Sequence, residues 1–190
     1  MGRPRTYDRE AALASAMEAF WERGYSATSI RDLVQVMQMV PKSVYAEFGG
    51  KDALFVATIE HYVAEQSARY RVQLGEAPFG LERIEGYFES LREGQEHRGC
   101  FLVNTLAESA SIPAEALERV QGFFRWLEGL YAQNLAAADR AGTLRPGLDV
   151  ARVASALVVY DQGLAVASRS SAQRGVLADG ALALLDAFRA

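Results

Sequence analysis

Apolar residues recur at helical spacing along almost the whole chain, and this feature most limits the fold. In the first segment Leu13, Ala16 and Phe20 repeat at three- and four-residue intervals, which places them on one face of a helix. No stretch shows the clean alternation of apolar and polar residues, bounded by hairpin turns, that predicts a half-buried strand. The pattern therefore predicts an all-α fold with about nine helices.

Local capping and breaking residues predict where these helices begin and end. The first is expected to start near Tyr7 and Asp8, with Asp8 as its N-cap, and to stop at Gly24. Ser29, with Asp32 three residues on, predicts a capping box for a short helix through about Val36. Further helices are expected over Pro41–Phe48, Lys51–Leu74, Leu81–Gln95, Cys100–Ser109, Ala114–Ala141, Val150–Arg169 and Gln173–Ala190.

Size and composition exclude several classes of protein. A chain of 190 residues that is 50% hydrophobic can bury a core without disulfides or metal. One cysteine, Cys100, cannot form an internal disulfide, and His61 and His97 do not make a metal-ligand cluster, so we expect no metal and no cofactor. No apolar run reaches the roughly 18 to 20 residues of a spanning helix, and the N-terminus lacks a signal core. A cytoplasmic protein without a membrane partner is predicted.

The charge distribution restricts any contact with nucleic acid to the N-terminal end. Residues 1–51 hold seven Lys/Arg against six Asp/Glu, whereas the remainder holds 13 against 18, and the net charge of the chain is −4. Such a protein does not coat nucleic acid through bulk positive charge. DNA would have to be bound by a few well-placed cations.

Two short helices joined by a tight turn and supported by an amphipathic first helix predict a helix-turn-helix, whose second helix enters the major groove of DNA. Here that helix spans Pro41–Phe48, and Pro41 suits its first turn. Phe48 and Leu54 are expected to pack inward, with Tyr45 and Lys51 near the DNA backbone. A lysine at a helix start is unfavourable unless a phosphate lies beside it. Taken alone, a pattern such as Tyr45, Phe48 and Lys51 at three-residue spacing more often consists of core residues plus a solvated charge.

Two segments carry a family resemblance. Gly24–Leu33 (GYSATSIRDL) and Ser43–Phe55 (SVYAEFGGKDALF) resemble the tetracycline-repressor (TetR) family of transcriptional regulators. Arg98–Asn104 (RGCFLVN) is similar to a segment of one branch of that family. The resemblance implies a helix-turn-helix DNA-binding domain over residues 1–52 and a helical effector-binding and dimerisation domain over 53–190. It also implies a repressor that a small hydrophobic effector releases from its operator.

Carried over residue by residue, the resemblance implies the DNA contacts. Phosphate contacts, which fix position, fall to Thr28, Ser29, Arg31, Tyr45 and Lys51. Contacts to bases in the major groove fall to Lys42, Ser43 and Ala46 on the helix that begins at Pro41, and to Gln38 in the turn before it. Pro41 itself is also a candidate DNA-contacting residue. An arm with Arg3 and Arg5 would add minor-groove or phosphate contacts.

This chain departs from the family pattern at the turn before that helix. Gln38 stands where the family usually has glycine, and Val40 stands where it usually has a capping serine. A glutamine at positive φ and a valine as N-cap are each locally unfavourable. Val34 and Met37 also replace smaller family residues, so we expect the contact between the two helices of the helix-turn-helix to pack differently.

One reading helix makes too few base contacts for useful specificity, so a homodimer on a palindromic operator is expected. The last two helices are the expected seam, as in the family. Alternatively, these helices complete the core of the monomer. The apolar residues in question are Ala151, Val153, Ala154, Leu157, Val158, Leu164, Ala165, Val176, Leu177, Leu182, Leu184, Leu185 and Phe188.

Aromatic residues concentrate between residues 81 and 141, where the resemblance implies that an unknown small-molecule effector binds. An aromatic stripe at helical spacing is equally compatible with an ordinary core. The candidate ligand-binding residues are Tyr87, Cys100, Phe101, Asn104, Glu108, Phe124, Leu127, Tyr131 and Tyr160.

Two other functions compete with this prediction. Cys100, beside Arg98 and His97 near a predicted helix start, would act as a redox or electrophile sensor if these neighbours favour its thiolate; otherwise it is a small buried apolar residue. A small helical enzyme is a distant alternative. The chain shows no supported Ser/His/Asp set, phosphate loop or metal set, so no catalytic residues are expected.

Overall fold

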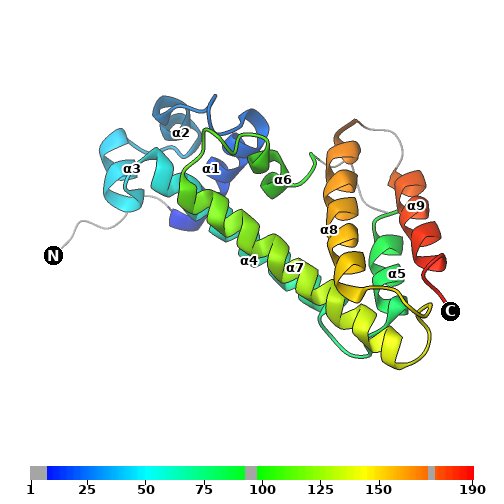
Figure 1. Cartoon of the computed structure of the whole chain (residues 1–190). Helices are drawn as coiled ribbons and strands as arrows, with labels where there is room; N and C mark the ends of the chain where they lie inside the picture. The colour runs from blue at the N-terminus through cyan, green and yellow to red at the C-terminus, as the bar shows by residue number, and fades with distance from the viewer. Residues whose placement is uncertain (1–7, 93–97, 171–173) are drawn as a thin grey trace. The chain divides into compact units, whose positions relative to one another are not determined.

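The computed structural model describes residues 8–92, 98–170 and 174–190 of the chain. These residues form an all-helical fold, and the order of its elements is followed by colour in Figure 1. The helices are α1 (Arg9–Arg23), α2 (Ile30–Val36), α3 (Pro41–Phe48), α4 (Lys51–Leu74), α5 (Leu81–Ser90), α6 (Phe101–Leu106), α7 (Ala114–Arg140), α8 (Val150–Ala167), the 3-10 turn η1 (Ser168–Ser170) and α9 (Arg174–Asp186).

The predicted caps of the first helices are present. The Asp8 carboxylate accepts hydrogen bonds from the backbone N–H groups of Glu10 and Ala11, at 2.9 and 3.3 Å, and Gly24 ends α1 with φ of 84°. Ser29 and Asp32 form the predicted capping box. These local contacts satisfy helix-end donors that would otherwise lack partners, so the boundaries are set by short-range chemistry.

The described residues divide into two compact units. One comprises Met1–Ala64 with Asn104–Gln121, and the other Glu65–Val103 with Gly122–Ala190. The division falls inside α4, α6 and α7, so each of these helices contributes residues to both units. Each compact unit is made of two separate segments, whereas the predicted domains are the continuous ranges 1–52 and 53–190. The division into a DNA-binding and an effector domain therefore stays a prediction.

The first unit is built around the buried face of α1. Leu13, Ala16 and Phe20 are buried, as the helical spacing predicted. The Phe20 ring packs edge-on against Phe55 of α4, with ring centroids 4.9 Å apart. Buried side chains of α2, of α3 and of the turn between them complete this core: Leu33, Met37, Met39, Val44 and Phe48.

In the second unit, polar contacts fix the ends of the helices. Buried Asn134 of α7 donates to the Leu74 carbonyl at 2.9 Å and accepts from the Gly80 N–H at 3.2 Å, which secures the α4–α5 connection.

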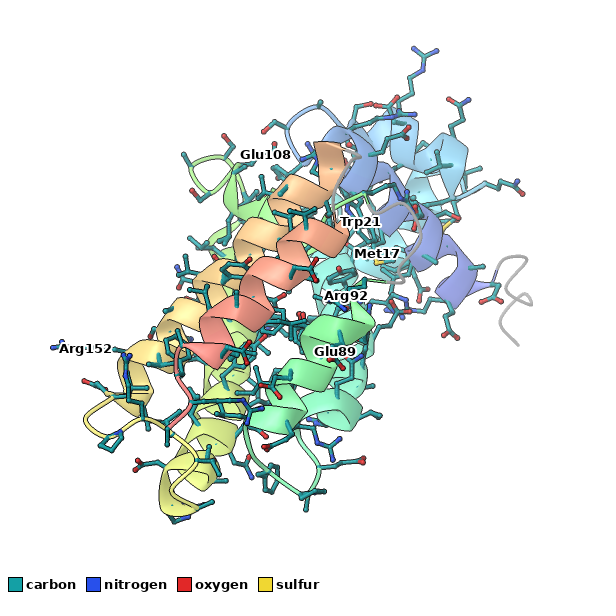
Figure 2. All side chains as sticks on the ribbon, turned by 90° about the vertical axis from the view of Figure 1, so that its right-hand side faces the viewer. Met17, Trp21, Glu89, Arg92, Glu108 and Arg152 are labelled. Atoms are coloured by element: carbon teal, nitrogen blue, oxygen red, sulfur yellow. The ribbon has the colours of Figure 1, made fainter. Side chains whose placement is uncertain are left out.

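Ion pairs connect the end of α5 and the C-terminal segment. Arg189 forms an ion pair with Glu85 at 2.6 Å. Arg92, labelled in Figure 2, donates to Asp179 of α9. These pairs join α9 to α5.

Helix α5 ends at Ser90 and not at the expected Gln95, and two other predicted helices are also shorter than expected. Instead of continuing to Ser109, α6 ends at Leu106, and Ala107 and Glu108 form turns through three-residue backbone hydrogen bonds. The last helix, α9, ends at Asp186 because the chain beyond it pairs with residues 143–145, where Arg145 N–H donates to the Phe188 carbonyl at 2.8 Å. Helical periodicity alone did not predict these ends.

Candidate nucleic-acid interface and interior site

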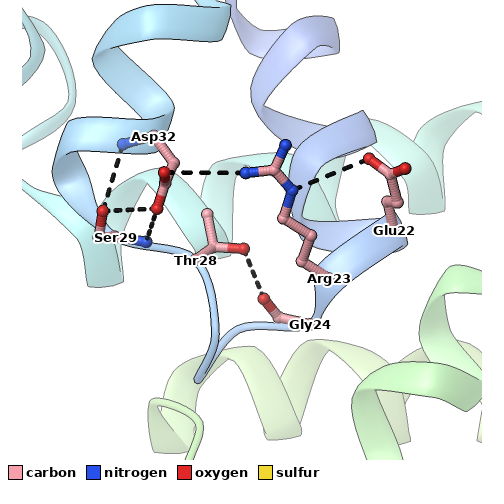
Figure 3. A network of polar contacts seen from close by, with 6 residues as sticks. All are labelled: Glu22, Arg23, Gly24, Thr28, Ser29 and Asp32. Atoms are coloured by element: carbon pink, nitrogen blue, oxygen red, sulfur yellow. Dashed lines mark hydrogen bonds and ion pairs between the residues drawn. The ribbon is translucent and has the colours of Figure 1, made fainter.

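The start of α2 is held by a small polar network, drawn in Figure 3. Ser29 N–H donates to Asp32 at 2.8 Å and Asp32 N–H donates to the Ser29 hydroxyl oxygen at 3.2 Å. Hydrogen bonds from Ser29 and the charge of Arg23, 3.8 Å away, hold the pKa of Asp32 below its usual value. The carboxylate therefore stays ionised at the positive end of the helix dipole.

The turn between α2 and α3 has the unfavourable geometry that the sequence predicted. Gln38 has a φ of 53° and is the sole non-glycine residue with positive φ in the described chain. Val40 occupies the N-cap position of α3 with no side-chain hydrogen bond, and Pro41 occupies the first turn. A backbone hydrogen bond from Met39 N–H to the Val34 carbonyl, 3.1 Å long, closes the turn.

Helix α3 has one buried and one exposed face. Val44 and Phe48 point into the core, whereas Lys42, Tyr45 and Ala46 are exposed, Tyr45 by 56%. A large aromatic ring that stays exposed on a short helix is available to a partner. This face therefore presents one cation, one phenol and one methyl group on an α-helix, an element that a DNA major groove admits.

The start of α4, three residues after the end of α3, carries a second cation. The Lys51 ammonium lies 4.1 Å from the centroid of the Tyr25 ring, and the Tyr25 hydroxyl donates to Asp52 at 2.6 Å. Burial, together with the hydrogen bond and charge of Asp52, raises the pKa of Tyr25 to about 12. Tyr25 therefore stays protonated, and its ring restrains the position of Lys51 through a cation–π contact.

The structure places the predicted DNA-contacting residues as follows. Ser29, Arg31, Gln38, Pro41, Lys42, Tyr45 and Ala46 are exposed, and Ser43 and Lys51 are half-buried. Arg3 and Arg5 lie outside the described residues. Thr28 does not fit the expected phosphate contact, because its side chain is buried and its hydroxyl donates to the Gly24 carbonyl at 2.7 Å. Its contribution is to shape the loop before α2.

A carboxylate in the second unit is surrounded by tyrosine hydroxyls from three other helices. Asp161 of α8 accepts from Tyr70 of α4 at 2.8 Å, from Tyr87 of α5 at 2.6 Å and from Tyr131 of α7 at 3.5 Å. The hydroxyls of Tyr70 and Tyr87 also lie within 3.0 Å of each other. We call Asp161 and these three tyrosines the Asp161 cluster.

The environment of this cluster shifts its titration. Burial raises the pKa of Asp161, although the three tyrosine hydroxyls and the charge of Arg69 oppose the shift. Burial first, and the charge of Asp161 second, raise the pKa values of all three tyrosines. Phenols that remain protonated are the donors that a buried carboxylate requires.

The predicted ligand-binding residues separate into three groups. Tyr87 and Tyr131 belong to the Asp161 cluster. Elsewhere in the second unit, Phe101 and Leu127 are buried, Cys100 and Phe124 are half-buried, and Tyr160 donates to the Leu177 carbonyl at 2.7 Å. Asn104 and Glu108 belong to the first unit. The Glu108 carboxylate does not fit the expected ligand contact, because it accepts from Tyr25 and Ser26 N–H groups at 2.9 Å each.

Sequence reasoning missed Asp161 and Tyr70. The available signal was an acidic residue in the middle of α8, which is otherwise apolar over Val153–Tyr160. A carboxylate at such a position is costly to bury unless donors surround it.

A separate groove of about 590 Å³ opens in the second unit. Of the predicted ligand-binding residues only Tyr87 lines it, so most of the predicted set faces elsewhere. Its lining comprises Val72, Gln73, Pro78, Phe79, Gly80, Glu82, Arg83, Gly86, Tyr87 and Ser90. Among the described residues, no group of three metal-ligating side chains occurs.

The outer faces of α8 and α9 expose large apolar side chains. Val159 and Val166 of α8 are 67% and 56% exposed, and Val176 and Leu184 of α9 are 60% and 43% exposed. By contrast, five of the residues predicted for the dimer seam lie inside the protomer: Val153, Ala154, Leu157, Val158 and Leu185. Helix α8 is also long and apolar enough to cross a membrane by length and composition alone, a property shared by core helices.

Comparisons with known proteins agree over both parts of the chain. Residues 12–58 match the family model for bacterial regulatory proteins of the tetR family, and residues 80–181 match the tetracyclin repressor-like C-terminal domain. The chain is 30% identical over 176 residues to the HTH-type transcriptional repressor ComR of Escherichia coli (strain K12), covering 90% of this chain and 84% of ComR.

Solved structures show the same fold. A cysteine mutant of the TetR family transcriptional regulator CifR, complexed with 26-bp double-strand operator DNA, matches with a TM-score of 0.84 and 28% identity, covering 98% of this chain and all of that one. The reduced form of E. coli NemR matches with a TM-score of 0.82 and 21% identity over 96% of each chain.

Proposed function

The chain belongs to the TetR family of DNA-binding transcriptional regulators, and we propose that it is a cytoplasmic repressor that occupies a palindromic operator as a homodimer until a small effector releases it. The observation that carries this proposal is the exposed face of α3, with Lys42, Tyr45 and Ala46, together with the restrained Lys51 at the start of α4. Lys42 would meet guanine acceptors and Ala46 a thymine methyl, whereas Tyr45 and Lys51 would hold phosphates. This function requires no catalytic step.

A gel-shift series with the full chain tests the proposal. The probe is the DNA upstream of its own gene, with a scrambled duplex of equal length as competitor. We expect selective binding that weakens steeply with salt, and we expect Lys42→Ala to lose selectivity. Arg140→Ala is the matched control, since Arg140 is exposed in the last turn of α7, far in sequence from the helix-turn-helix. Equal binding to both duplexes at physiological salt would refute the proposal.

The exposed apolar face of α8 and α9 supports the dimer. Val159 and Val166 are seven residues apart, so they lie on one face of α8, and Gly163 lies between them with open space around it. Such a stripe allows close approach of a second helix, and apolar side chains of this size are costly to leave in water. We therefore place the seam on this outer face and assign the buried members of the predicted set to the protomer core.

The Asp161 cluster supports an effector site within the second unit. It offers one buried anion among aromatic rings, including Phe88, whose centroid is 6.4 Å from that of Tyr131. This chemistry suits a small, largely apolar effector that carries a hydrogen-bond donor or a positive charge. In a thermal-shift screen of such compounds, Asp161→Asn should weaken binding at least tenfold and Arg140→Ala, at an exposed position of α7, should not. Compounds that bind and release operator equally well in Asp161→Asn would refute this site.

A second candidate function is sensing through Cys100. The supporting observation is that Cys100 is half-buried directly before the first residue of α6 and two residues after Arg98, positions at which a helix N-terminus and a cation favour a thiolate. His97, the other predicted neighbour, lies outside the described residues. If Cys100→Ser abolishes operator release by peroxide or an electrophile, the sensing function holds; unchanged release would end it.

A further inference from the structure

The turn after α6 carries a carboxylate that reaches the loop between α1 and α2. Both Glu108 oxygens are used: one accepts from Tyr25 N–H and the other from Ser26 N–H, each at 2.9 Å. Burial raises the pKa of Glu108, but the donors at Ser26 and Tyr25 and the charge of Lys51 outweigh it and hold the pKa below its usual value. The carboxylate is therefore ionised when it binds the loop. Glu108 is labelled in Figure 2.

Gly24 makes room for this contact. It has φ of 84°, and a Cβ at this position would lie 2.2 Å from a Glu108 carboxylate oxygen. An approach this close excludes any larger residue while the carboxylate keeps its place. The glycine that ends α1 is thus shaped to Glu108 as well as to the helix end.

The loop that Glu108 holds leads to two candidate phosphate contacts. On the side of α2, the Thr28 hydroxyl donates to the Gly24 carbonyl, and Ser29 caps the start of α2 (Figure 3). On the side of α4, the Tyr25 ring lies under the Lys51 ammonium. A displacement of the Tyr25 backbone would therefore move the start of α2 and release the restraint on Lys51 together.

We propose that Glu108 is a positioning residue for operator binding: its carboxylate holds the α1–α2 loop so that Ser29, Arg31 and Lys51 meet the DNA backbone together. This inference rests on the proposed function. Glu108 comes from the part of the sequence that matches the C-terminal family model, yet it lies in the same compact unit as the helix-turn-helix. A shift of the turn after α6 would withdraw the carboxylate and weaken DNA binding without any contact between that turn and DNA.

Glu108→Gln tests this, because the amide nitrogen it introduces cannot accept the second N–H. Operator affinity and its salt dependence are measured for the full chain at a temperature where every variant is folded, as monitored by Trp21 fluorescence with Trp126 replaced by Phe. We expect operator affinity to fall at least tenfold and the salt slope to become shallower as phosphate contacts are lost. Glu118→Gln, an exposed glutamate on α7, should stay within twofold of wild type.

A double-mutant cycle makes the result independent of any general loss of stability. Gly24→Ala adds a methyl group against the Glu108 carboxylate, and its backbone strain is the same in every background. We expect this substitution to weaken operator binding much less in a Glu108→Ala background than in wild type. Equal effects in both backgrounds, or operator binding by Glu108→Gln within twofold of wild type with an unchanged salt slope, would overturn the inference. Failure of the wild-type chain to bind operator would instead refute the proposed function.

Discussion

The missing cap of α3 gives a prediction that the structure makes quantitative. Val40 already has cap geometry, with φ of −90° and ψ of 152°, and its side chain is 61% exposed. Val40→Ser therefore needs no change of backbone and removes no core contact. Its hydroxyl oxygen would accept from the Lys42 N–H, since Pro41 has no N–H and the Ser43 N–H already donates to the Val40 carbonyl at 2.9 Å. Such a cap contributes about 1 kcal/mol.

The appropriate reference is Val40→Ala, which removes the valine without supplying a cap. Relative to it, Val40→Ser should raise the free energy of unfolding by about 1 kcal/mol and the midpoint by about 2–4 °C. The assay is thermal unfolding followed by Trp21 fluorescence in a Trp126→Phe background, because Trp21 belongs to the unit that contains α3.

Equal stability of the serine and alanine variants would refute this reasoning. It would mean that the first N–H groups of α3 are already satisfied and that Val40 costs the fold nothing. In the reciprocal Trp21→Phe background, a gain in stability seen only in the Trp126 signal would refute it as well, since Trp126 belongs to the other unit.

Three further predictions follow from the same contacts. Lys51→Ala should reduce the slope of log affinity against log salt by about 2 in a homodimer, as one phosphate contact is lost per protomer; an unchanged slope in a gel-shift titration would exclude Lys51 as a phosphate contact. Because the pKa of Asp161 is raised on folding, the folded state binds its proton more tightly than the unfolded state. Denaturant unfolding should therefore show stability that falls as pH rises from about 4 through that raised pKa, and Asp161→Asn should remove this dependence; a dependence that persists would place its origin elsewhere. Val166→Asp should shift the dimer to monomer in sedimentation while leaving helicity by circular dichroism unchanged, whereas a variant that stays dimeric would move the seam off this face.

Short-range signals predicted the helix-turn-helix well. The Asp8 cap, the Ser29 capping box and the Gly24 stop each join residues that are at most four positions apart. The local sequence therefore contains both partners of each interaction. The strained turn was also predictable, since Gln38 and Val40 stand in positions where local backbone preferences are known.

Long-range contacts were the part that sequence could not predict. Glu108 binds residues 82 and 83 positions away, and Asp161 binds a tyrosine 91 positions away. Helical periodicity places each residue on a face of its own helix but does not specify which other helix meets that face. A polar residue on an inward face was therefore interpreted as a ligand contact in the case of Glu108, and was overlooked in the case of Asp161.

The charge of the chain explains why such positioning contacts matter for its function. Arg31 and Lys51 are the described cations expected at phosphates and Lys42 is expected at bases. A homodimer therefore brings about six cations to the DNA, four of them to phosphates, with a salt slope near −4. Acidic groups outnumber basic ones in the rest of the chain, so bulk attraction does not make up for a misplaced cation. Binding then depends on geometry more than on charge, and the contact that fixes the α1–α2 loop controls several of these cations together. This is the physical reason to expect that a carboxylate without any DNA contact affects operator affinity as strongly as a lysine that touches a phosphate.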